Sequence, residues 1–297
     1  MVLGLLLAVL LALLAGYLHR HSVAVLQPSG TVAYGERRLI LIAAGLGLLV
    51  VVPVYVMAFM IAWKYREGNK SKKQYRPTWD GHRGIEFTWW AIPSMIILIL
   101  AIITWNSSHA LDPYAPLASA NKPLAIQVIA LDWKWLFIYP QQNIASVNLV
   151  KFPVDTPVEF TITSDAPMNS FWIPQLGGQI YAMPGMATQL HLMAGKAGNY
   201  EGSSANISGN GFAGMTFTAN ASSQSEFTRW VATVKQADKS LGYPEYDKLA
   251  RPSKDNQVVF YNSAANQLFD YTVNKYNVPA ELLKPGQAMV MPAGGHH

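Results

Sequence analysis

Two long stretches of uncharged side chains dominate the hydrophobic pattern in the first third of the chain. Residues 39–63 carry no charge and are interrupted only by Pro53 and two glycines, and residues 85–105 carry only Glu86. At a rise of about 1.5 Å per residue, either stretch as a helix is long enough to cross a hydrocarbon core about 30 Å thick. Tryptophans, which favour membrane–water interfaces, stand near the ends of both stretches: Trp63, Trp89, Trp90 and Trp105. The pattern predicts a transmembrane helical hairpin within residues 25–110.

The first residues form a separate apolar segment, rich in leucine and alanine. Residues 1–24 are predicted to be a signal peptide or an N-terminal anchor, because both are apolar segments of this kind. The run Leu14-Ala15-Gly16-Tyr17 is similar to the cleavage box of bacterial lipoproteins, with tyrosine in place of the lipid-bearing cysteine. We therefore expect no lipid on Tyr17, and cleavage or retention of the segment stays open.

Beyond the hairpin, the pattern changes to short apolar or alternating runs separated by Pro, Gly, Asn and Asp, which is typical of β-strands joined by turns. The runs cover residues 124–130, 133–139, 146–152, 158–163, 188–193 and 215–219. Short strands at this spacing predict a Greek-key β-sandwich, which we assign to residues 111–222.

The last part of the chain, residues 223–297, is predicted to be a helical extension followed by a tail. Residues 222–237 have an amphipathic pattern with Ser225 as the candidate N-cap, and residues 264–276 are a second possible helix. The expected fold class is therefore membrane-anchored α+β, with a two-helix hairpin, a β-sandwich and a partly helical C-terminal extension.

Composition and charge support membrane attachment. Hydrophobic residues make up 51% of the chain and charged residues only 13%, whereas soluble domains carry about 25% charged residues. The net charge of +5 equals that of one loop between the two uncharged stretches, where two acidic residues, Glu67 and Asp80, offset seven basic ones: Lys64, Arg66, Lys70, Lys72, Lys73, Arg76 and Arg83. Because basic loops stay in the cytoplasm, we expect the flanks of the hairpin and the sandwich outside. Charge confined to one loop gives no reason to expect a nucleic-acid partner.

Two motifs of the expected sandwich together have the outline of a metal site. Residues 200–215 read YEGSSANISGNGFAGM, and residues 169–174 read NSFWIP. They resemble the copper loop of subunit II of the haem-copper respiratory oxidases, Y-x-G-x-C-x-E-x-C-G-x-x-H-x-x-M, and its partner motif H-S-[FW]-x-[IV]-P. The six ligand positions, of which only the methionine is retained, are held by Asn169, Ser204, Asn206, Ser208, Phe212 and Met215.

The residues at these vestigial copper-ligand positions lack the chemistry of a copper pair. Copper is selected by soft sulfur and imidazole ligands, and this chain contains no cysteine. Serine hydroxyls keep their protons at neutral pH, Phe212 has no lone pair, and the thioether of Met215 is a weak ligand. The sequence therefore predicts no metal in this chain. If the resemblance to the copper loop is set aside, residues 200–215 are typical of a surface turn rich in Gly, Ser and Asn.

This set of losses is similar to that of the quinol-oxidising branch of the family, the cytochrome o type ubiquinol oxidases, and the resemblance covers residues 25–235. It implies a cupredoxin-like domain in the periplasm and a proton-pumping ubiquinol oxidase of the aerobic respiratory chain in the bacterial inner membrane. It also implies that haems, copper and ubiquinol chemistry belong to subunit I. This chain would then carry no cofactor and no catalytic residue, and its partners would be subunit I, further small membrane subunits and the lipid bilayer.

Glu86 is the candidate residue for proton uptake. An ionisable residue in a membrane helix is a functional candidate, and Glu86, Trp89 and Pro93 match the family motif E-x-x-W-x-x-x-P. The resemblance implies that this glutamate is the mouth of the K proton channel leading into subunit I. The alternative is a carboxylate that only complements the positive end of its helix, and both interpretations stay open.

Two other functions remain as alternatives. A cytochrome c oxidase subunit II would need the copper pair, which the absence of cysteine disfavours. A free-standing, membrane-anchored cupredoxin-like protein for binding or copper delivery would need no oxidase partner. Co-purification with a haem protein that oxidises quinol separates this alternative from an oxidase subunit.

Overall fold

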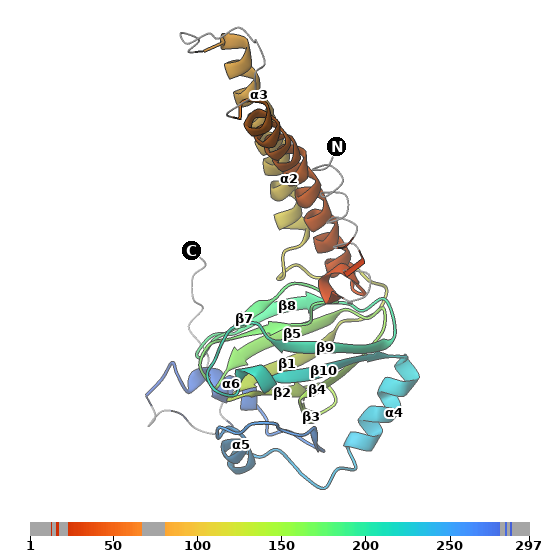
Figure 1. Ribbon diagram of the computed structural model, residues 1–297. Coiled ribbons are helices and arrows are strands. Elements are labelled where there is room, and N and C mark those ends of the chain that lie inside the picture. The colour runs from red at the N-terminus through yellow and green to blue at the C-terminus, as the bar shows by residue number, and fades with distance from the viewer. Residues whose placement is uncertain are drawn as a thin grey trace. The chain divides into compact units, whose positions relative to one another are not determined.

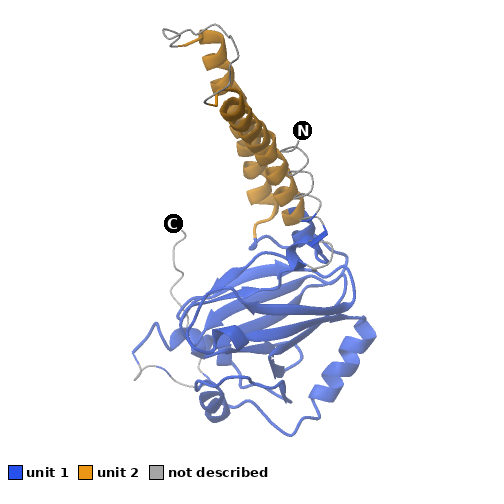
Figure 2. Cartoon of the chain, in the orientation of Figure 1, with its two compact units in different colours: residues 1–35, 113–297 blue, residues 36–112 orange. Residues whose placement is uncertain are grey.

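The computed structural model describes residues 13, 16, 17, 23–66, 81–279, 283 and 286. The chain forms two compact units, one made of residues 1–35 and 113–297 and the other of residues 36–112 (Figure 2). Most of the expected signal or anchor segment, much of the basic loop and the end of the tail lie outside the described residues.

The hairpin unit is built from two long helices, α2 (Thr31–Lys64) and α3 (Arg83–Ala110). Both are long and apolar enough to cross a membrane, and their large apolar side chains are mostly exposed, as expected of helices whose solvent is lipid. The two helices confirm the expected hairpin. Each helix is longer than its uncharged stretch. The main additions are residues 31–38, which include charged side chains, at the start of α2, and residues 106–110, which include polar side chains, at the end of α3.

The second unit contains a sandwich of two sheets (Figure 1). Its six-stranded sheet has the order β11-β3-β2-β1-β5-β8, and its five-stranded sheet has the order β4-β10-β9-β6-β7. The strands are β1 (Leu124–Leu131), β2 (Lys134–Tyr139), β3 (Ile144–Val147), β4 (Leu149–Pro153), β5 (Val158–Ser164), β6 (Asn169–Trp172), β7 (Ile180–Ala182), β8 (Thr188–Leu192), β9 (Gly198–Ser204), β10 (Thr216–Ser222) and β11 (Val259–Tyr261). The pairs β1–β5 and β4–β10 are parallel, and the remaining pairs are antiparallel.

The expected single strand over residues 146–152 is wrong. The chain leaves the six-stranded sheet after β3, turns at Asn148 with φ 57°, and enters the five-stranded sheet as β4. Asparagine tolerates this left-handed conformation better than most residues. Its side chain also fastens the turn, because Oδ1 accepts a hydrogen bond from Trp135 N at 2.9 Å.

Aromatic side chains from both sheets fill the core. Trp135 and Phe137 of β2 meet Phe171 of β6 and Phe217 of β10, and the rings of Phe171 and Phe217 stack at 5.0 Å. A Cβ on Gly202 of β9 would overlap the Phe217 ring. The glycine is therefore needed for the close approach of β9 to this cluster.

The C-terminal extension begins with α4 (Gln224–Val234), whose N-cap is Ser223. The Ser223 hydroxyl accepts from Glu226 N, and the Glu226 carboxylate accepts from Ser223 N at 3.0 Å, which is a capping box. The expected cap at Ser225 is wrong, because only Ser223 has the glutamate three residues later. Ser225 lies in the first turn of the helix.

The rest of the extension consists of α5 (Tyr243–Leu249), β11 and α6 (Leu268–Asn274), so the second expected helix is shorter than residues 264–276. The apolar side chains of the extension pack on the face of the six-stranded sheet that points away from the sandwich core. They form a second cluster, which includes Leu136 and Val147 of the sheet and Tyr246 and Phe269 of the extension. The expected fold class of hairpin, sandwich and partly helical extension is confirmed.

Candidate functional site

The vestigial copper-ligand positions come together at one end of the five-stranded sheet. Asn169 begins β6, Ser204 ends β9, and the loop that follows contains Asn206, Ser208 and the short helix η2 (Phe212–Gly214) before Met215. Strands β6 and β9 are paired, with Phe171 opposite Ser204. The fold therefore keeps the loop and its partner motif side by side.

Two of these side chains are engaged with each other. Ser204 Oγ lies 3.0 Å from Asn169 Oδ1 and 3.1 Å from the carbonyl oxygen of Asn206, so its single proton is shared between two acceptors. The same hydroxyl accepts from Ser170 N at 3.3 Å. A serine hydroxyl in these contacts is a proton donor, whereas a cysteine at a copper pair acts as a deprotonated bridge.

The two asparagine side chains use their amide groups on the backbone. Asn169 Nδ2 donates to Pro167 O at 2.8 Å, and Asn206 Nδ2 donates to Met168 O at 2.8 Å. Asn169 and Ser204 are buried. The buried polar groups of Asn169 and Ser204 therefore have protein partners, and these hydrogen bonds hold the loop without a metal ligand.

Trp133 packs against the second half of the loop. Its Nε1 donates to Ser208 O at 3.1 Å, and a Cβ on Gly211 would overlap its ring. Gly209 has φ 106°, a conformation available mainly to glycine. The Ser208 hydroxyl is buried without a hydrogen-bond partner among the described residues, and Met215 is fully buried.

The donor set at these positions does not fit a copper pair. It consists of two hydroxyls, two amides and one thioether, without thiolate or imidazole. Within the described residues, no group of three or more His, Cys, Asp or Glu side chains could hold a metal ion. No redox step can therefore be assigned to this loop.

A buried lysine attaches the extension beside Trp133. Lys134 is 1% exposed, and its Nζ donates to Arg251 O at 2.8 Å and to the Ser253 hydroxyl. Burial lowers the pKa of Lys134, and the charge of Asp132 opposes this shift. The backbone of residues 251–253 is thereby fixed to the start of β2.

A buried carboxylate attaches the extension at a second point. Asp165, which follows β5, accepts from Tyr246 Oη at 2.8 Å, from Lys275 Nζ at 2.8 Å and from Tyr276 Oη at 2.6 Å. Thr272 Oγ1 donates to Tyr246 Oη at 3.0 Å. Burial and the Asp165 charge raise the pKa of Tyr246 well above its usual range. We call Asp165, Tyr246, Thr272, Lys275 and Tyr276 the Asp165 clasp.

Sequence reasoning missed the Asp165 clasp and the buried Lys134. Their partners lie in segments that carry no recognisable motif for such contacts, and Asp165 and Tyr246 are 81 positions apart. The only local signal is the number of tyrosines between residues 243 and 276.

Glu86 belongs to the other unit, so the structure does not group it with the vestigial copper-ligand positions. It lies exposed in the first turn of α3. His82 is the N-cap of this helix, and its Nδ1 lies 3.4 Å from Ile85 N. The carboxylate therefore stands where the helix dipole favours negative charge, which suits both interpretations of this residue.

Comparison with known proteins identifies the family. Residues 140–222 match the model for the "Cytochrome C oxidase subunit II, periplasmic domain", and residues 235–280 match the "COX Aromatic Rich Motif". The second match covers most of the extension, including Tyr246 and Lys275. Of the two residues that attach the extension, Asp165 lies in the first matched segment and Lys134 lies before it.

Full-length relatives extend this match. The chain is 54% identical over 251 residues to "Cytochrome bo(3) ubiquinol oxidase subunit 2" of Pseudomonas putida, covering 84% of this chain and 80% of that protein. It is 50% identical over 255 residues to "Ubiquinol oxidase subunit 2" of Acetobacter aceti, with 85% and 82% covered. It is 39% identical over 241 residues to "Quinol oxidase subunit 2" of Bacillus subtilis (strain 168), with 80% and 75% covered. The chain therefore belongs to the ubiquinol oxidase subunit 2 family.

Proposed function

We propose that this chain is the redox-inert subunit II of a membrane-bound ubiquinol oxidase, an oxidoreductase complex of the aerobic respiratory chain. In this complex, haem and copper, oxygen reduction, quinol oxidation and proton pumping are carried by subunit I. Family membership supports the assignment to the complex, because relatives that match most of the chain are named as this subunit.

One observation carries the redox-inert role. The side chains of Asn169, Ser204 and Asn206, at three of the copper-ligand positions, are hydrogen-bonded to one another or to the backbone. They therefore stabilise a metal-free loop, and electrons have no centre to occupy between the sandwich and subunit I. This observation argues against a cytochrome c oxidase subunit II, and it also argues against copper delivery.

The remaining role is to anchor and orient the complex. We assign residues 1–24 to a signal peptide or anchor, 25–110 to the transmembrane hairpin, 111–222 to the cupredoxin-like domain and 223–297 to the extension and tail. The basic loop is cytoplasmic and the sandwich periplasmic, in the bacterial inner membrane. Partners are subunit I, further small membrane subunits and the bilayer, and Glu86 is the candidate for proton uptake.

Affinity purification of the full chain in mild detergent tests the assignment to the complex. We expect a haem-containing membrane protein to co-purify and the preparation to oxidise ubiquinol with consumption of oxygen. Isolation of the chain without a haem protein, under conditions that keep other membrane complexes intact, would favour the free-standing alternative.

Copper analysis tests the redox-inert role separately. After loading with copper and removal of free metal, the full chain separated from its partners in detergent should hold no stoichiometric copper and show no purple colour. A stoichiometric purple centre would overturn the redox-inert role without affecting the assignment to the complex.

A further inference from the structure

Three methionines come together where the β6–β7 strand pair ends: Met168, Met183 and Met186. Met168 directly precedes Asn169, the first residue of β6, and Met183 directly follows Ala182, the last residue of β7. Asn169 and Ala182 are opposite each other in the antiparallel pair. Continued by one position, this register places Met168 opposite Met183. Side chains that face each other across antiparallel strands start about 4.5–5.5 Å apart, measured between Cβ atoms.

Met168 and Met183 lie on the outer face of the five-stranded sheet. Side chains alternate between the two faces of a strand, and Phe171 of β6 and Ile180 of β7 pack in the core. Met168 is three positions before Phe171 and therefore belongs to the other face. The same holds for Met183, which is three positions after Ile180. Met168 is 39% exposed and Met183 is half-buried, so the two side chains are accessible from the same side.

A tight turn adds Met186, which is 51% exposed, to this pair. Met186 N donates to Met183 O at 3.3 Å. Pro184 and Gly185 occupy the two central positions, with φ 75° at the glycine, as in a type II β-turn. The first and fourth residues of such a turn lie within about 7 Å of each other, measured between Cα atoms. Asn277 Nδ2 donates to Gly185 O at 2.6 Å and fastens the turn to the extension. The three thioethers are within reach of one another, because the methionine side chain has three rotatable bonds.

We call Met168, Met183 and Met186 the methionine triad. Exposed apolar side chains that are scattered singly are ordinary on protein surfaces, whereas the triad gathers three ligands of one chemical type from two strands and a turn. Thioether sulfur is a soft, neutral ligand, and soft ligands of this kind select Cu(I). Within the part of the chain that the structure describes, no group of three or more His, Cys, Asp or Glu side chains could hold a metal ion, so harder ions have no comparable site there.

We propose that the methionine triad binds one Cu(I) ion through its three thioether sulfurs. The site is separate from the vestigial copper-ligand positions, because it uses none of those six side chains. It holds a single ion without thiolate, so it produces no purple, mixed-valence colour. Neutral thioethers are weak ligands, so the ion exchanges with free metal and is lost when free metal is removed. The site depends only on the sandwich, and its absence would leave the oxidase assignment unchanged.

The experiment uses the full chain in detergent, with whatever subunits co-purify and with an isotope label in the methionine methyl groups of this chain. The sample is titrated at equilibrium with Ag(I), a soft monovalent ion that needs no reductant, and separately with Cu(I) kept reduced under nitrogen. Nuclear magnetic resonance should show the methyl signals of Met168, Met183 and Met186 shifting together and reaching saturation at one ion per triad. Because this chain has no cysteine, none of its own thiolates competes for either ion.

Leucine variants separate the triad from other methionines. Leucine replaces methionine at nearly constant volume and removes one sulfur. Loss of even an outer-shell partner weakens a metal site about 10–100-fold, so Met168→Leu, Met183→Leu and Met186→Leu should each raise the dissociation constant for Ag(I) at least tenfold. The matched control is Met57→Leu combined with Met60→Leu, because these exposed residues of α2 have the spacing of Met183 and Met186. The control should bind Ag(I) at the triad like the parent.

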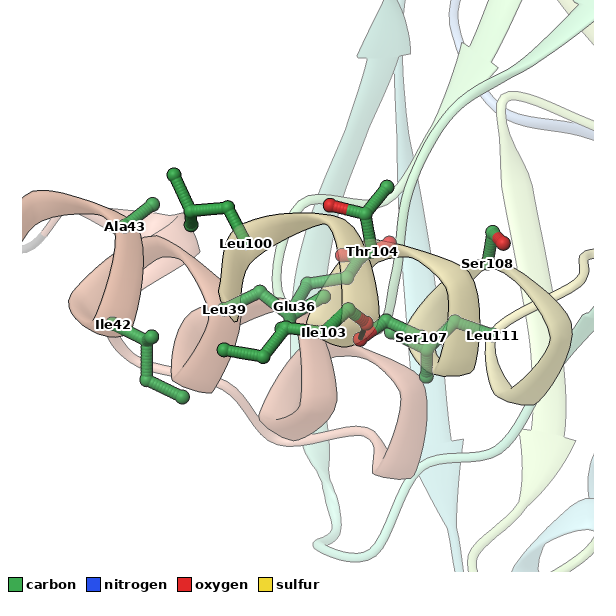
Figure 3. Close-up of a pocket in the computed structure, with 10 residues that line it drawn as sticks. All are labelled: Glu36, Leu39, Ile42, Ala43, Leu100, Ile103, Thr104, Ser107, Ser108 and Leu111. Carbon is green, nitrogen blue, oxygen red and sulfur yellow. Dashed lines mark hydrogen bonds between the residues drawn. The ribbon is translucent and has the colours of Figure 1, made fainter. Parts of the chain in front are cut away.

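Two other parts of the chain do not disturb this comparison. The crevice between α2 and α3 has a volume of ≈ 370 Å³, and none of the residues that line it is a methionine (Figure 3), so it offers no soft ligand. The tail, residues 289–297, contains further methionines and histidines. Its sequence is the same in every variant, so a difference between variants is due to the triad.

Several results would overturn the proposal. They are the absence of a shift at the triad, a shift at one of its methionines alone, or equal affinity for Ag(I) in the parent and the triad variants. An assembled complex in which another subunit covers the triad and excludes the ion would also overturn it, since the triad would then be a protein contact. If one triad variant fails to fold, the other two variants and the titration of the parent decide.

Discussion

Serine at residues 204 and 208 offers the loop a hydroxyl where the resembling copper loop has a cysteine thiolate. Ser204 donates to Asn169 across the β6–β9 pair, so the contact between the two motifs survives as a hydrogen bond. A hydroxyl in that place cannot bridge two copper ions, since it stays protonated at neutral pH. The two motifs therefore stay in contact, although no side chain at these positions supplies the thiolate or imidazole that a copper pair needs.

Restoration of the ligands should therefore restore copper binding. The changes are Asn169→His, Ser204→Cys, Asn206→Glu, Ser208→Cys and Phe212→His. We expect the combined variant to bind copper and to show a purple, mixed-valence chromophore, because thiolate bridges and imidazoles select copper. As a control, the same variant with Ser208 retained lacks one bridge and should form no purple pair, as checked by absorption and electron paramagnetic resonance spectra. Absence of colour in both variants would mean that the loop has lost the geometry of the copper site.

Proton uptake through Glu86 is a second prediction at the residue scale. Glu86→Gln keeps the size of the side chain and removes its proton. If the carboxylate loads protons for subunit I, quinol oxidase turnover should fall at least tenfold, or about 1.4 kcal/mol of barrier, with normal assembly and haem content. Glu86→Asp, the matched control, should retain much of the rate.

A Glu86→Gln variant with the turnover of the parent would contradict a role of Glu86 in proton uptake. Unchanged turnover of Glu86→Gln in an intact complex would leave only the helix-dipole role, for which a few tenths of a kcal/mol of stability is expected. That outcome would remove Glu86 from the mechanism.

At the scale of elements, the extension is joined to the sandwich by apolar packing and by the Asp165 clasp. Tyr246 is fully buried and donates to a buried carboxylate. Hydrogen bonds to charged groups contribute about 1.5–3 kcal/mol, so we expect Tyr246→Phe to lower the free energy of unfolding by about 2 kcal/mol. Tyr276→Phe should lower it less, because Tyr276 is 47% exposed and its bond to Asp165 is screened by water.

The pH dependence of this clasp has a definite sign. Burial raises the folded-state pKa of Tyr246 above its ordinary value of 10.0, so the folded protein keeps a proton that the unfolded chain loses above pH 10. The contribution of Tyr246 is therefore fully present below pH 10 and is lost as pH rises further.

Alkaline denaturation of parent and variant isolates this effect. Lys134 acts in the opposite direction, because its pKa is lower in the folded protein than in the unfolded chain. As pH rises, the folded protein releases this proton first, so the contribution of Lys134 to the free energy of unfolding increases. The difference between parent and Tyr246→Phe cancels the lysine contribution. That difference should shrink above pH 10; a constant difference up to pH 12 would contradict the role assigned to the Tyr246 proton.

The start of α4 gives a prediction with a neighbouring control. Ser223 closes the capping box with Glu226, and loss of such a cap costs about 1 kcal/mol. We expect Ser223→Ala to lower the free energy of unfolding by that amount and Ser225→Ala to change it by less than about 0.5 kcal/mol, as measured by urea titration. Equal effects of the two changes would contradict the assignment of the cap.

At the scale of the whole molecule, the charge of the loop between the helices predicts orientation. The chain has no cysteine, so single cysteines can be labelled without background. Ser71→Cys, in the basic loop, should react with a membrane-impermeant maleimide only after the inner membrane is opened. Ser225→Cys, on the exposed face of α4, should react from the periplasm. Reversed labelling would contradict the charge argument.

The sequence by itself determined the class of the protein. Uncharged stretches of bilayer length predict the hairpin because the requirement is local, and they are confirmed as α2 and α3. The resemblance carried by residues 169–174 and 200–215 is confirmed by membership of the ubiquinol oxidase subunit 2 family. The absence of cysteine leaves the loop without thiolate ligands, since the type of ligand depends on residue type.

The tertiary structure alone decided which segments meet. It divides the expected strand at Asn148 between two sheets, places the cap of α4 at Ser223, and joins Asp165 to Tyr246 and Lys134 to residues 251–253. The physical reason is the distance along the chain over which each kind of information acts. Periodicity, charge and motifs act over a few residues, whereas a buried carboxylate or ammonium is stable only through partners that the fold brings from distant parts of the chain.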